Sequence, residues 1–400
     1  MASVTIKNLD IIFGQNDLDR TLEMLDQGKT RQEISNETGD IVGVHNASLE
    51  VKEGEICVLM GLSGSGKSSL LRAINGLNTT TRGELVVEYD GEQTDIATCD
   101  RDTLRTIRAN CVSMVFQKFA LMPWLTVVEN VAFGLEMKGI AKGVRISKAM
   151  EQLEMVGLAE WSEKYPHELS GGMQQRVGLA RAFSMDADVL LMDEPFSALD
   201  PLIRNQLQDE LLELQTRLKK TIIFVSHDLD EALKLGTNIA IMESARIIQQ
   251  GKPEDIVLRP STEYVREFVA HTNPLNVLCG ESLMTPAKEL AVNDDRYYLD
   301  QEKISWVTVS LKGEVMSAGS QHAGDIHLLK WNQEVDIEAL SVESLVVASP
   351  SITMREALEI RYRTGRPIVI EENGRICGVL SDKDFYHALL GKHFSQVSEG

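Results

Sequence analysis

The segment Gly61–Ser69 carries the residue types that hold a nucleoside triphosphate. In its sequence, GLSGSGKSS, the glycines lack Cβ atoms, so the backbone can turn tightly and aim N–H groups at phosphate oxygens. Lys67 supplies a positive charge for the β and γ phosphates, and Ser68 supplies a hydroxyl for Mg²⁺. A glycine-rich structural turn is the alternative, but a strand before the segment and a helix after it favour the phosphate-binding function. The segment therefore predicts a nucleotide site.

The flanking residues predict the elements that such a loop needs. Ile56–Met60 is a short apolar run typical of a buried strand, and residues 70–75 form a helical pattern whose N-terminus brings a positive dipole end to the phosphates. Further apolar strand runs occupy 110–116, 188–194 and 221–226. Apolar strands that alternate with helices predict an α/β fold, with a mostly parallel sheet covered by helices.

Two stretches are predicted to be helical additions to this core. Residues 16–40 are interpreted as an insertion of two short helices, the second capped by Thr30 with Glu33 at capping-box spacing. Residues 118–168 lack most strand signals, and we expect an inserted helical subdomain there. Its predicted helices cover 119–124, 127–137 and 149–156.

The pattern changes near Asn273–Pro274, and we expect a linker over 273–285 between domains at 1–272 and 286–400. Residues 353–388 predict the order helix, strand, turn, strand, helix, typical of a small α+β domain. Residues 281–340 show weak similarity to the same unit, which suggests a degenerate second copy.

Composition limits the kinds of partner. The formal net charge of −20 argues against a nucleic-acid binder, which would need a basic face. The five cysteines are scattered without a CxxC pair, which favours a reducing compartment. No basic-then-apolar leader begins the sequence, and no apolar run reaches the roughly 20 residues of a membrane-spanning helix. If the protein works at a membrane, we expect a partner to supply the span.

Polar residues that follow predicted strands are candidates for catalysis. Asp193 and Glu194 end one strand, and His227 and Gln117 follow two others directly. Adjacent carboxylates suit metal binding and general base catalysis, although a solvated strand end is the simpler reading of such a pair. A histidine or a glutamine at a strand end is also often only structural. The residues alone leave these alternatives open.

Taken together, the motifs resemble those of the ATP-binding subunits of ABC transporters, over roughly residues 1–270. They are Gly61–Ser69, Gln117 after Met-Val-Phe, Leu169-Ser-Gly-Gly-Met-Gln-Gln, Met192-Asp-Glu-Pro195, Ser197-Ala-Leu-Asp200 and Ser226-His-Asp228. The resemblance implies a P-loop ATPase core, with ATP and Mg²⁺ as cofactors.

The resemblance also implies roles for single residues. Ser68, Gln117 and Asp193 would hold Mg²⁺, Glu194 would be the general base, and His227 would contact the γ-phosphate. Gln117 would in addition couple the helical subdomain to the nucleotide. Phe13 would stack on adenine, although an ordinary core aromatic remains the alternative. The residues implied to contact ATP are Phe13, Gly61, Ser63, Gly64, Ser65, Gly66, Lys67, Ser68, Ser69, Ser170, Gly171, Gly172, Gln174 and Asp200.

The same resemblance implies partners. The Ser170–Gly172 signature would bind the γ-phosphate of ATP held by a second copy, so that a homodimer forms two composite sites. An integral-membrane permease would dock near Phe119–Trp124, although these residues could instead pack the subdomain core. The insertion at 16–40 is similar to that of the quaternary-amine import branch, and residues 117–124 and 270–278 are most similar to the choline-importer ATPase. This predicts import of choline or glycine betaine, with a solute-binding protein as an indirect partner, at the cytoplasmic face of the inner membrane.

The C-terminal region resembles a CBS domain, with one clear half at about 342–392. Residues 378–384, GVLSDKD, match the stretch where such domains place a hydroxyl on phosphate and a carboxylate on ribose. Many CBS domains bind no ligand, so the choice stays open between ligand binding, ionic-strength sensing and neither. A soluble, non-transport ABC ATPase and a nucleotide sensor with little turnover are the competing functions. The missing coiled-coil insertion and basic patches argue against the first, and the presence of both Glu194 and His227 argues against the second.

Overall fold

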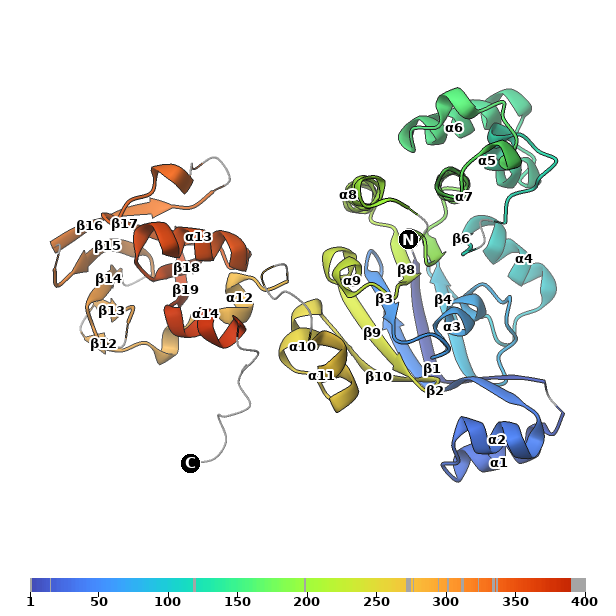
Figure 1. Ribbon diagram of the computed structural model, residues 1–400, viewed down its shortest axis with the longest axis horizontal. Coiled ribbons are helices and arrows are strands. Elements are labelled where there is room, and N and C mark those ends of the chain that lie inside the picture. Colours follow the sequence, from blue (N-terminus) through green and yellow to red (C-terminus); the bar gives the residue numbers. More distant parts are fainter. Residues whose placement is uncertain are drawn as a thin grey trace. The chain divides into compact units, whose positions relative to one another are not determined.

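The computed structural model describes residues 2–14, 16–117, 120–197, 199–270, 275, 277–293, 295–300, 302–310, 313–322, 324–332, 335 and 337–389. The chain divides into two compact units (Figure 1). The first unit is Met1–Ile256 with Ser261–Val265, and the second is Val257–Pro260 with Arg266–Gly400. Within the described residues, no helix combines the length and the apolar character that crossing a membrane requires.

A six-stranded sheet forms the centre of the first unit, in the order β10-β9-β3-β8-β7-β6. All neighbouring pairs are parallel except β10 with β9. Every residue of β3, β7 and β8 is buried, as the apolar runs predicted. The mostly parallel α/β fold is therefore confirmed. The strands are β3 (Ile56–Met60), β6 (Val112–Val115), β7 (Val189–Asp193), β8 (Thr221–Val225), β9 (Asn238–Glu243) and β10 (Arg246–Gly251).

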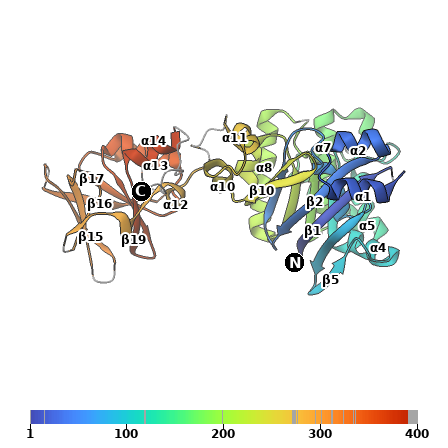
Figure 2. The same ribbon diagram turned by 90° about the horizontal axis from the view of Figure 1, so that it is seen from below.

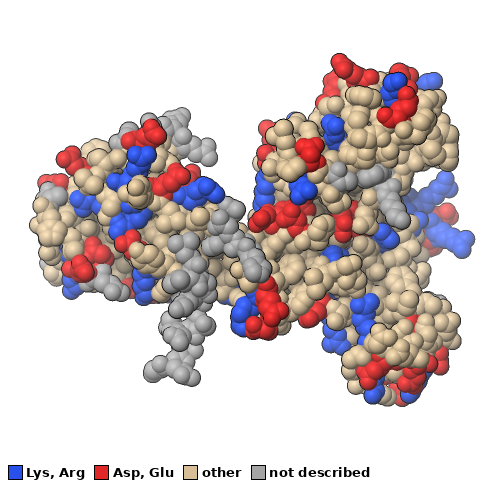
Figure 3. All heavy atoms as spheres, in the orientation of Figure 1, with Lys and Arg blue, Asp and Glu red and all other residues tan. Residues whose placement is uncertain are grey.

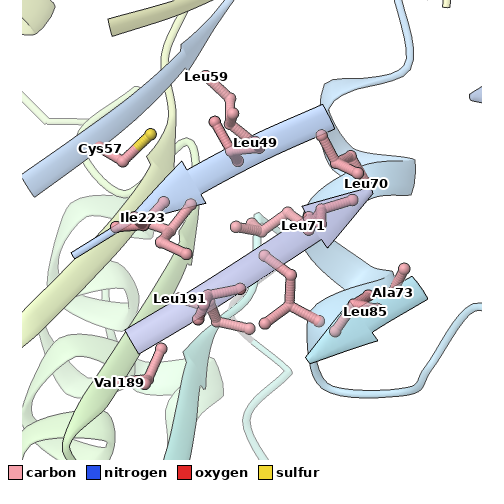
Figure 4. Packing of buried hydrophobic residues seen from close by; sticks show 14 of the residues in the cluster. Leu49, Cys57, Leu59, Leu70, Leu71, Ala73, Leu85, Val189, Leu191 and Ile223 are labelled. Carbon is pink, nitrogen blue, oxygen red and sulfur yellow. The ribbon is translucent and has the colours of Figure 1, made fainter. Parts of the chain in front are cut away.

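A second, antiparallel sheet of four strands has the order β2-β1-β4-β5. Its strands are β1 (Ala2–Phe13), β2 (Ile41–Val51), β4 (Arg82–Tyr89) and β5 (Glu92–Asp95). Helix α3 (Lys67–Ile74) contributes Leu70 and Leu71 to the apolar cluster that also contains Leu49 of β2 and Leu191 of β7 (Figure 4). Because both sheets bury side chains in this cluster, the helix that begins at the phosphate loop is fixed from two sides.

The insertion folds as two helices, α1 (Leu18–Asp26) and α2 (Arg31–Thr38), next to the ends of β1 and β2 (Figures 1 and 2). The predicted capping box is present, because Thr30 accepts the Glu33 N–H and Glu33 accepts the Thr30 N–H. Gly39 ends α2 at φ 74°, a conformation that glycine adopts readily. The insertion has its own apolar cluster around Met24, Leu25 and Ile34.

The segment 120–168 is mostly helical, but two predictions within it are wrong. Residues 120–124 form no helix, and helix α6 begins at Lys142 rather than 149; Phe119 lies outside the described residues. Pro123 disfavours helical backbone at Met122, and the buried Asn130 side chain holds this loop, accepting the Met122 N–H at 2.8 Å and donating to the Met122 carbonyl at 3.1 Å. Here α5 is Val127–Met137 and α6 is Lys142–Met155, followed by the short helices η1 (Ala159–Trp161) and η2 (Pro166–Glu168).

Other helices complete the first unit and the connection to the second. They are α4 (Arg101–Asn110), α7 (Gly171–Ser184), α8 (Pro201–Leu218), α9 (Leu229–Leu235), α10 (Pro253–Leu258) and α11 (Glu263–Val269). Asn110 ends α4, so the strand predicted over 110–116 is shorter and begins at Val112.

The second unit contains a nine-stranded sheet in the order β11-β19-β18-β17-β16-β15-β14-β13-β12. The predicted helix, strand, turn, strand, helix order over 353–388 is present as α13, β18, β19 and α14. No second copy of this unit is found in the described part of 281–340, because β12 to β16 pair there as successive antiparallel neighbours. The elements are α12 (Gly280–Leu283), β11 (Thr285–Pro286), η4 (Ala287–Glu289), β12 (Val292–Asn293), β13 (Arg296–Tyr298), β14 (Ser305–Val309), β15 (Val315–Ser320), β16 (Gly324–Lys330), η5 (Ile337–Ala339), β17 (Ser344–Ala348), α13 (Met354–Thr364), β18 (Ile368–Glu372), β19 (Arg375–Leu380) and α14 (Asp382–Leu389).

Candidate functional site

The phosphate loop joins β3 to α3 and depends on glycine at three positions. Gly61, Gly64 and Gly66 have φ of 137°, 77° and 103°, a region that side chains rarely adopt. A Cβ on Gly61 would also clash with the Met242 carbonyl, and one on Gly66 with the Gly43 carbonyl. Nothing lies near the Cβ position of Gly64, so glycine is needed there for its backbone conformation alone.

Lys67 lies inside this loop and is 6% exposed. Its Nζ donates to the carbonyls of Gly61 at 2.7 Å and Leu62 at 2.9 Å. Burial lowers the pKa of Lys67, while the nearby Glu194 and Asp193 carboxylates act in the opposite direction. The ammonium group is thus fixed by the loop that would bind phosphate.

The other predicted loop residues differ in exposure. Ser63 and Gly64 are exposed, Ser69 is half-buried, and Ser65 is buried. The Ser65 Oγ has no hydrogen-bond partner, whereas its N–H donates to the Leu62 carbonyl at 3.2 Å. Unpartnered buried hydroxyls are uncommon in folded proteins and often mark functional loops.

Asp193 brings a carboxylate to the start of α3. It is fully buried at the end of β7, accepts the Ser68 hydroxyl at 2.7 Å through Oδ1, and pairs with Arg72 at 2.8 Å through Oδ2. A hydroxyl beside a carboxylate provides the hard oxygen ligands that Mg²⁺ prefers. The described residues contain no cluster of three or more His, Cys, Asp or Glu side chains able to hold a metal. Arg72 was not predicted, although its position four residues after Ser68 places both on one helix face.

The three predicted catalytic residues converge on one carboxylate oxygen. Glu194 Oε2 accepts the Gln117 amide at 2.9 Å and lies 3.8 Å from His227 Nδ1. Glu194 has φ of 53°, a strained backbone that its neighbours hold in place: its N–H donates to the Val225 carbonyl at 3.1 Å, and the Gln175 amide donates to its carbonyl at 3.2 Å. Gln175 was not predicted.

A buried acid supports the loop that carries His227. Glu231 in α9 accepts the Ser226 hydroxyl and the Gln208 amide, the latter at 3.0 Å. Burial raises the pKa of Glu231, while these two hydrogen bonds act to lower it. Glu231 was not predicted from the sequence. It follows Ser226 by five residues, and this spacing is the local signal that could have indicated the contact.

The signature residues lie at a helix N-terminus, as predicted. Within the described residues, no hydrogen bond or ion pair connects them to the phosphate loop of the same chain. Ser170 caps α7 and accepts the Met173 N–H at 3.4 Å, and Gly171 is exposed with open space at its Cβ position. The Gln174 amide is already engaged with the carbonyls of Pro166 and Leu169. Asp200 caps α8 and accepts the Ile203 N–H at 3.1 Å.

Phe13 is the last residue of β1 and is 37% exposed. Its ring lies so close to Gly43 that a Cβ there would clash with it. The side chain is therefore partly accessible, and it lies against the strand whose Gly43 carbonyl approaches Gly66 of the phosphate loop.

Two residues from outside the predicted motifs also hold the phosphate loop. Arg31 of α2 donates to the Gly64 carbonyl at 2.9 Å, and the Tyr264 hydroxyl of α11 accepts the Leu62 N–H at 3.2 Å. No sequence pattern marked either residue, because both contacts depend on how separate elements pack.

In the second unit, the polar groups of the predicted motif at 378–384 form hydrogen bonds within the protein. Asp384 is 3% exposed, and its Oδ2 accepts both the N–H and the hydroxyl of Ser381 at 2.7 Å. Its Oδ1 accepts the Thr285 hydroxyl at 3.0 Å. The hydroxyl and carboxylate of this motif are thus engaged with each other.

Comparison with known proteins gives two family matches and many relatives. The family described as ABC transporter matches residues 44–197, and that described as CBS domain matches residues 337–391. The glycine betaine transport ATP-binding protein OpuAA of Bacillus subtilis is 48% identical over 290 residues, covering 72% of this chain and 68% of that protein. The glycine betaine/proline betaine protein ProV of Salmonella typhimurium is 39% identical over 96% of both chains, and the glycine betaine/carnitine protein GbuA of Listeria monocytogenes is 38% identical over 98% of both.

A solved structure supports the fold of the first unit. The dimeric, post-hydrolysis ATP-binding cassette MJ0796 bound to ADP and phosphate is 31% identical, with a TM-score of 0.54. The match covers 62% of this chain and 98% of that one.

Proposed function

The chain belongs to the ATP-binding subunits of ABC transporters, in the branch of the glycine betaine transport proteins, and we propose that it hydrolyses ATP to energise import of a quaternary amine through a membrane permease. The observation that supports this most directly is the convergence of Gln117 and His227 on Glu194, next to the phosphate loop. The names of its relatives favour transport over a non-transport ATPase or a nucleotide sensor. Among the solutes, glycine betaine is supported by those names, and choline remains a candidate.

Each residue of the site has a proposed role in ATP hydrolysis. Lys67 and the loop N–H groups would bind the β and γ phosphates, and Ser68, Asp193 and Gln117 would hold Mg²⁺. The ion, when bound, would neutralise charge on the phosphates. Glu194 would accept the proton of the attacking water, because its Oε2 is oriented by the Gln117 amide at 2.9 Å. His227 would contact the γ-phosphate while Glu231 and Ser226 fix its loop.

The ATP-bound protein is proposed to be a homodimer with two composite sites. Ser170, Gly171 and Gly172 lie at the N-terminus of α7, where backbone N–H groups favour an anion. They form no described hydrogen bond to the loop of their own chain, so the γ-phosphate of ATP on a second copy is the proposed ligand. Asp200 would lie near the seam, and Phe13 would stack on adenine. The Gln174 amide would have to exchange its present carbonyl partners to reach nucleotide.

The permease is proposed to dock on the helical subdomain, where Trp124 is 73% exposed. An exposed tryptophan on a subdomain surface is typical of a partner contact. Trp124→Ala should leave the thermal stability and the ATPase activity of the isolated protein unchanged, while coimmunoprecipitation with the permease and coupled uptake fall. Unchanged assembly and uptake would contradict this docking site.

The remaining assignments follow from this role. The protein would lie at the cytoplasmic face of the inner membrane, bound to its permease, with a solute-binding protein as an indirect partner and no nucleic acid. Residues 1–272 would be the nucleotide-binding domain, with the insertion at 16–40 and the helical subdomain at 118–168. Residues 286–400, after a linker at 273–285, would be a regulatory CBS-like domain. Deletion of 281–400 should then alter how transport depends on ionic strength.

The decisive experiment is uptake of labelled choline and labelled glycine betaine by cells that contain the permease and binding protein. Cells with the wild-type chain should take up one of the solutes, and cells with Glu194→Gln should not. The matched control is Glu160→Gln, an exposed acid of the helical subdomain that should keep full uptake. Uptake that is indifferent to Glu194 would overturn either the transport function or the role of this carboxylate.

A further inference from the structure

A hollow of about 790 Å³ lies between the insertion and the core of the first unit. We call it the insertion hollow, and its walls come from α1 and α2, from β2, and from the turn between β9 and β10. Its size is within the range of small-molecule sites in proteins. Its lining residues are Leu25, Gly28, Lys29, Thr30, Arg31, Gln32, Ser35, Ile41, Val42, His45, Ser244 and Arg246.

The insertion hollow is basic on a strongly acidic protein. Lys29, Arg31 and Arg246 line it, and no Asp or Glu does. Within the described residues, none of these three forms an ion pair, although the whole chain carries a net charge of −20. The Glu33 carboxylate, on which Lys29 acts electrostatically, is engaged in capping α2. In Figure 3, basic side chains gather where the α1–α2 lobe meets the sheets, whereas acidic ones cover much of the outer side of the lobe.

His45 of β2 adds a polar group to the wall of the insertion hollow. It is only 7% exposed and lines both the insertion hollow and a neighbouring hollow of about 390 Å³. Its Nδ1 lies 2.9 Å from the Asp10 carboxylate, which also accepts the Asn46 N–H and the Arg82 guanidinium. An ionised carboxylate only accepts hydrogen bonds, so Nδ1 carries the hydrogen. The other nitrogen, Nε2, has no hydrogen-bond partner among the described residues and can form one with a hydroxyl.

The walls therefore offer three kinds of contact. The cations suit phosphate, Nε2 of His45 suits a sugar hydroxyl, and the apolar Leu25, Ile41 and Val42 suit a flat ring. Arg31 connects the hollow to the phosphate loop, since its Nη1 donates to the Gly64 carbonyl while its other N–H groups remain available. We propose that the insertion hollow is a binding site for a nucleoside phosphate, whose phosphate contacts Lys29, Arg31 and Arg246.

The proposed ligand is a second nucleotide, bound beside the catalytic ATP. The catalytic ATP itself is assigned elsewhere, with its phosphates on Lys67 and the loop N–H groups and its adenine on Phe13. AMP separates the hollow from the phosphate loop as a probe, because AMP lacks the β and γ phosphates that the loop recognises.

The test is calorimetric titration of AMP into the full-length protein. The double variant Lys29→Ala/Arg246→Ala should weaken AMP binding by about tenfold or more, because two charged contacts are lost. Both residues are exposed, so the variant should fold, and melting temperature checks this. The matched control Lys52→Ala/Arg101→Ala removes two exposed cations elsewhere and should leave AMP binding unchanged. His45→Asn, which can still donate to Asp10, should also weaken binding of AMP but not of inorganic phosphate.

Adding MgATP to the wild-type protein separates the hollow from the catalytic site. Simultaneous binding of AMP and MgATP would support the proposal, and competition between them would overturn it, because AMP would then occupy the catalytic site. Several results would overturn the proposal: no AMP binding, AMP binding unaffected by Lys29→Ala/Arg246→Ala, or inorganic phosphate binding as tightly as AMP. MgATP turnover of the control variant reports the proposed ATPase function separately, so its loss would not be confused with failure of the hollow.

Discussion

The phosphate loop of the first unit and the Ser381–Asp384 motif of the second are both sequence patterns associated with nucleotides, yet their polar groups are in opposite conditions. In the loop, Ser63 and Gly64 are exposed, and the Ser65 hydroxyl has no partner. In the second unit, the Asp384 carboxylate is buried and accepts three hydrogen bonds from Ser381 and Thr285. The phosphate loop therefore has polar groups available to bind a ligand, whereas the polar groups of the Ser381–Asp384 motif are hydrogen-bonded within the fold.

This difference teaches that residue identity and spacing do not by themselves make a binding site. A buried carboxylate must find donors or lose free energy, and donors from the chain serve as well as donors from a ligand. In the loop, the left-handed backbone of the glycines lets the chain turn so that N–H groups can point at a bound phosphate. We therefore interpret Ser381 and Asp384 as a structural cap at the start of α14.

The largest expected effect on turnover comes from removing the Lys67 charge in the phosphate loop, and the matching change in the second motif removes the Ser381 hydroxyl. Lys67→Ala should reduce ATP turnover by a factor on the order of 10², because one preorganised electrostatic contact to the phosphates is lost. Ser381→Ala should leave turnover within about twofold. Phosphate release at saturating MgATP measures both. Similar losses in the two variants would mean that the second motif also serves nucleotide chemistry.

Asp384→Ala should destabilise the second unit by about 1–3 kcal/mol, because the Ser381 N–H, the Ser381 hydroxyl and the Thr285 hydroxyl lose their acceptor. Urea unfolding followed by tryptophan fluorescence measures this change, since Trp306 and Trp331 belong to this unit. Lys383→Ala, an exposed neighbour, is the control and should change nothing. A variant as stable as the wild type would refute the structural reading of Asp384.

Glu231 gives the first unit a stability that falls with rising pH. Its pKa is raised in the fold by burial, so ionisation above the ordinary value of 4.5 favours the unfolded chain. Glu231→Gln removes this ionisation and should gain melting temperature relative to the wild type as the pH rises from 4.5 to neutrality. Thermal scans across this range test the trend, and a difference that is independent of pH would contradict it.

Asp382 gives the second unit the opposite pH dependence, with the smallest expected effect. Arg361 donates to both of its oxygens, at 2.6 and 2.7 Å, and lowers the pKa of Asp382. The pair should contribute a few tenths to about 1 kcal/mol at neutral pH, since the carboxylate is half exposed. Arg361→Gln should lose this contribution at pH 7, and the loss should shrink as the pH falls below the ordinary pKa of 3.8 and disappear below the lowered pKa of the folded state. Arg363→Gln, on the exposed face of α13, is the control. A loss in Arg361→Gln that does not shrink as the pH falls below 3.8 would contradict the ion pair as the cause.

Much of the first unit could be predicted because its signals are local. Apolar runs predicted β3, β7 and β8, and the Thr30–Glu33 spacing predicted the cap of α2. The predicted helix at 119–124 failed in its described part because Asn130, further along the chain, provides hydrogen bonds that compete with helical ones. The suggested repeat at 281–340 failed because weak similarity over short segments cannot distinguish antiparallel strand pairing from a helix-strand unit.

Sequence by itself determined which residues could bind phosphate and act on water, since glycine spacing, Lys67 and the carboxylates after β7 have direct chemical consequences. Only the tertiary structure decided which of these groups lie together and which are already hydrogen-bonded within the protein. Parallel strands end at the same edge of the sheet, and this edge brings Gln117, Glu194 and His227 together from three distant segments. Packing of α2 and α11 added Arg31 and Tyr264 to the phosphate loop, and packing of Thr285 on Asp384 closed the second motif. Such contacts depend on the distance between elements, which no local pattern contains.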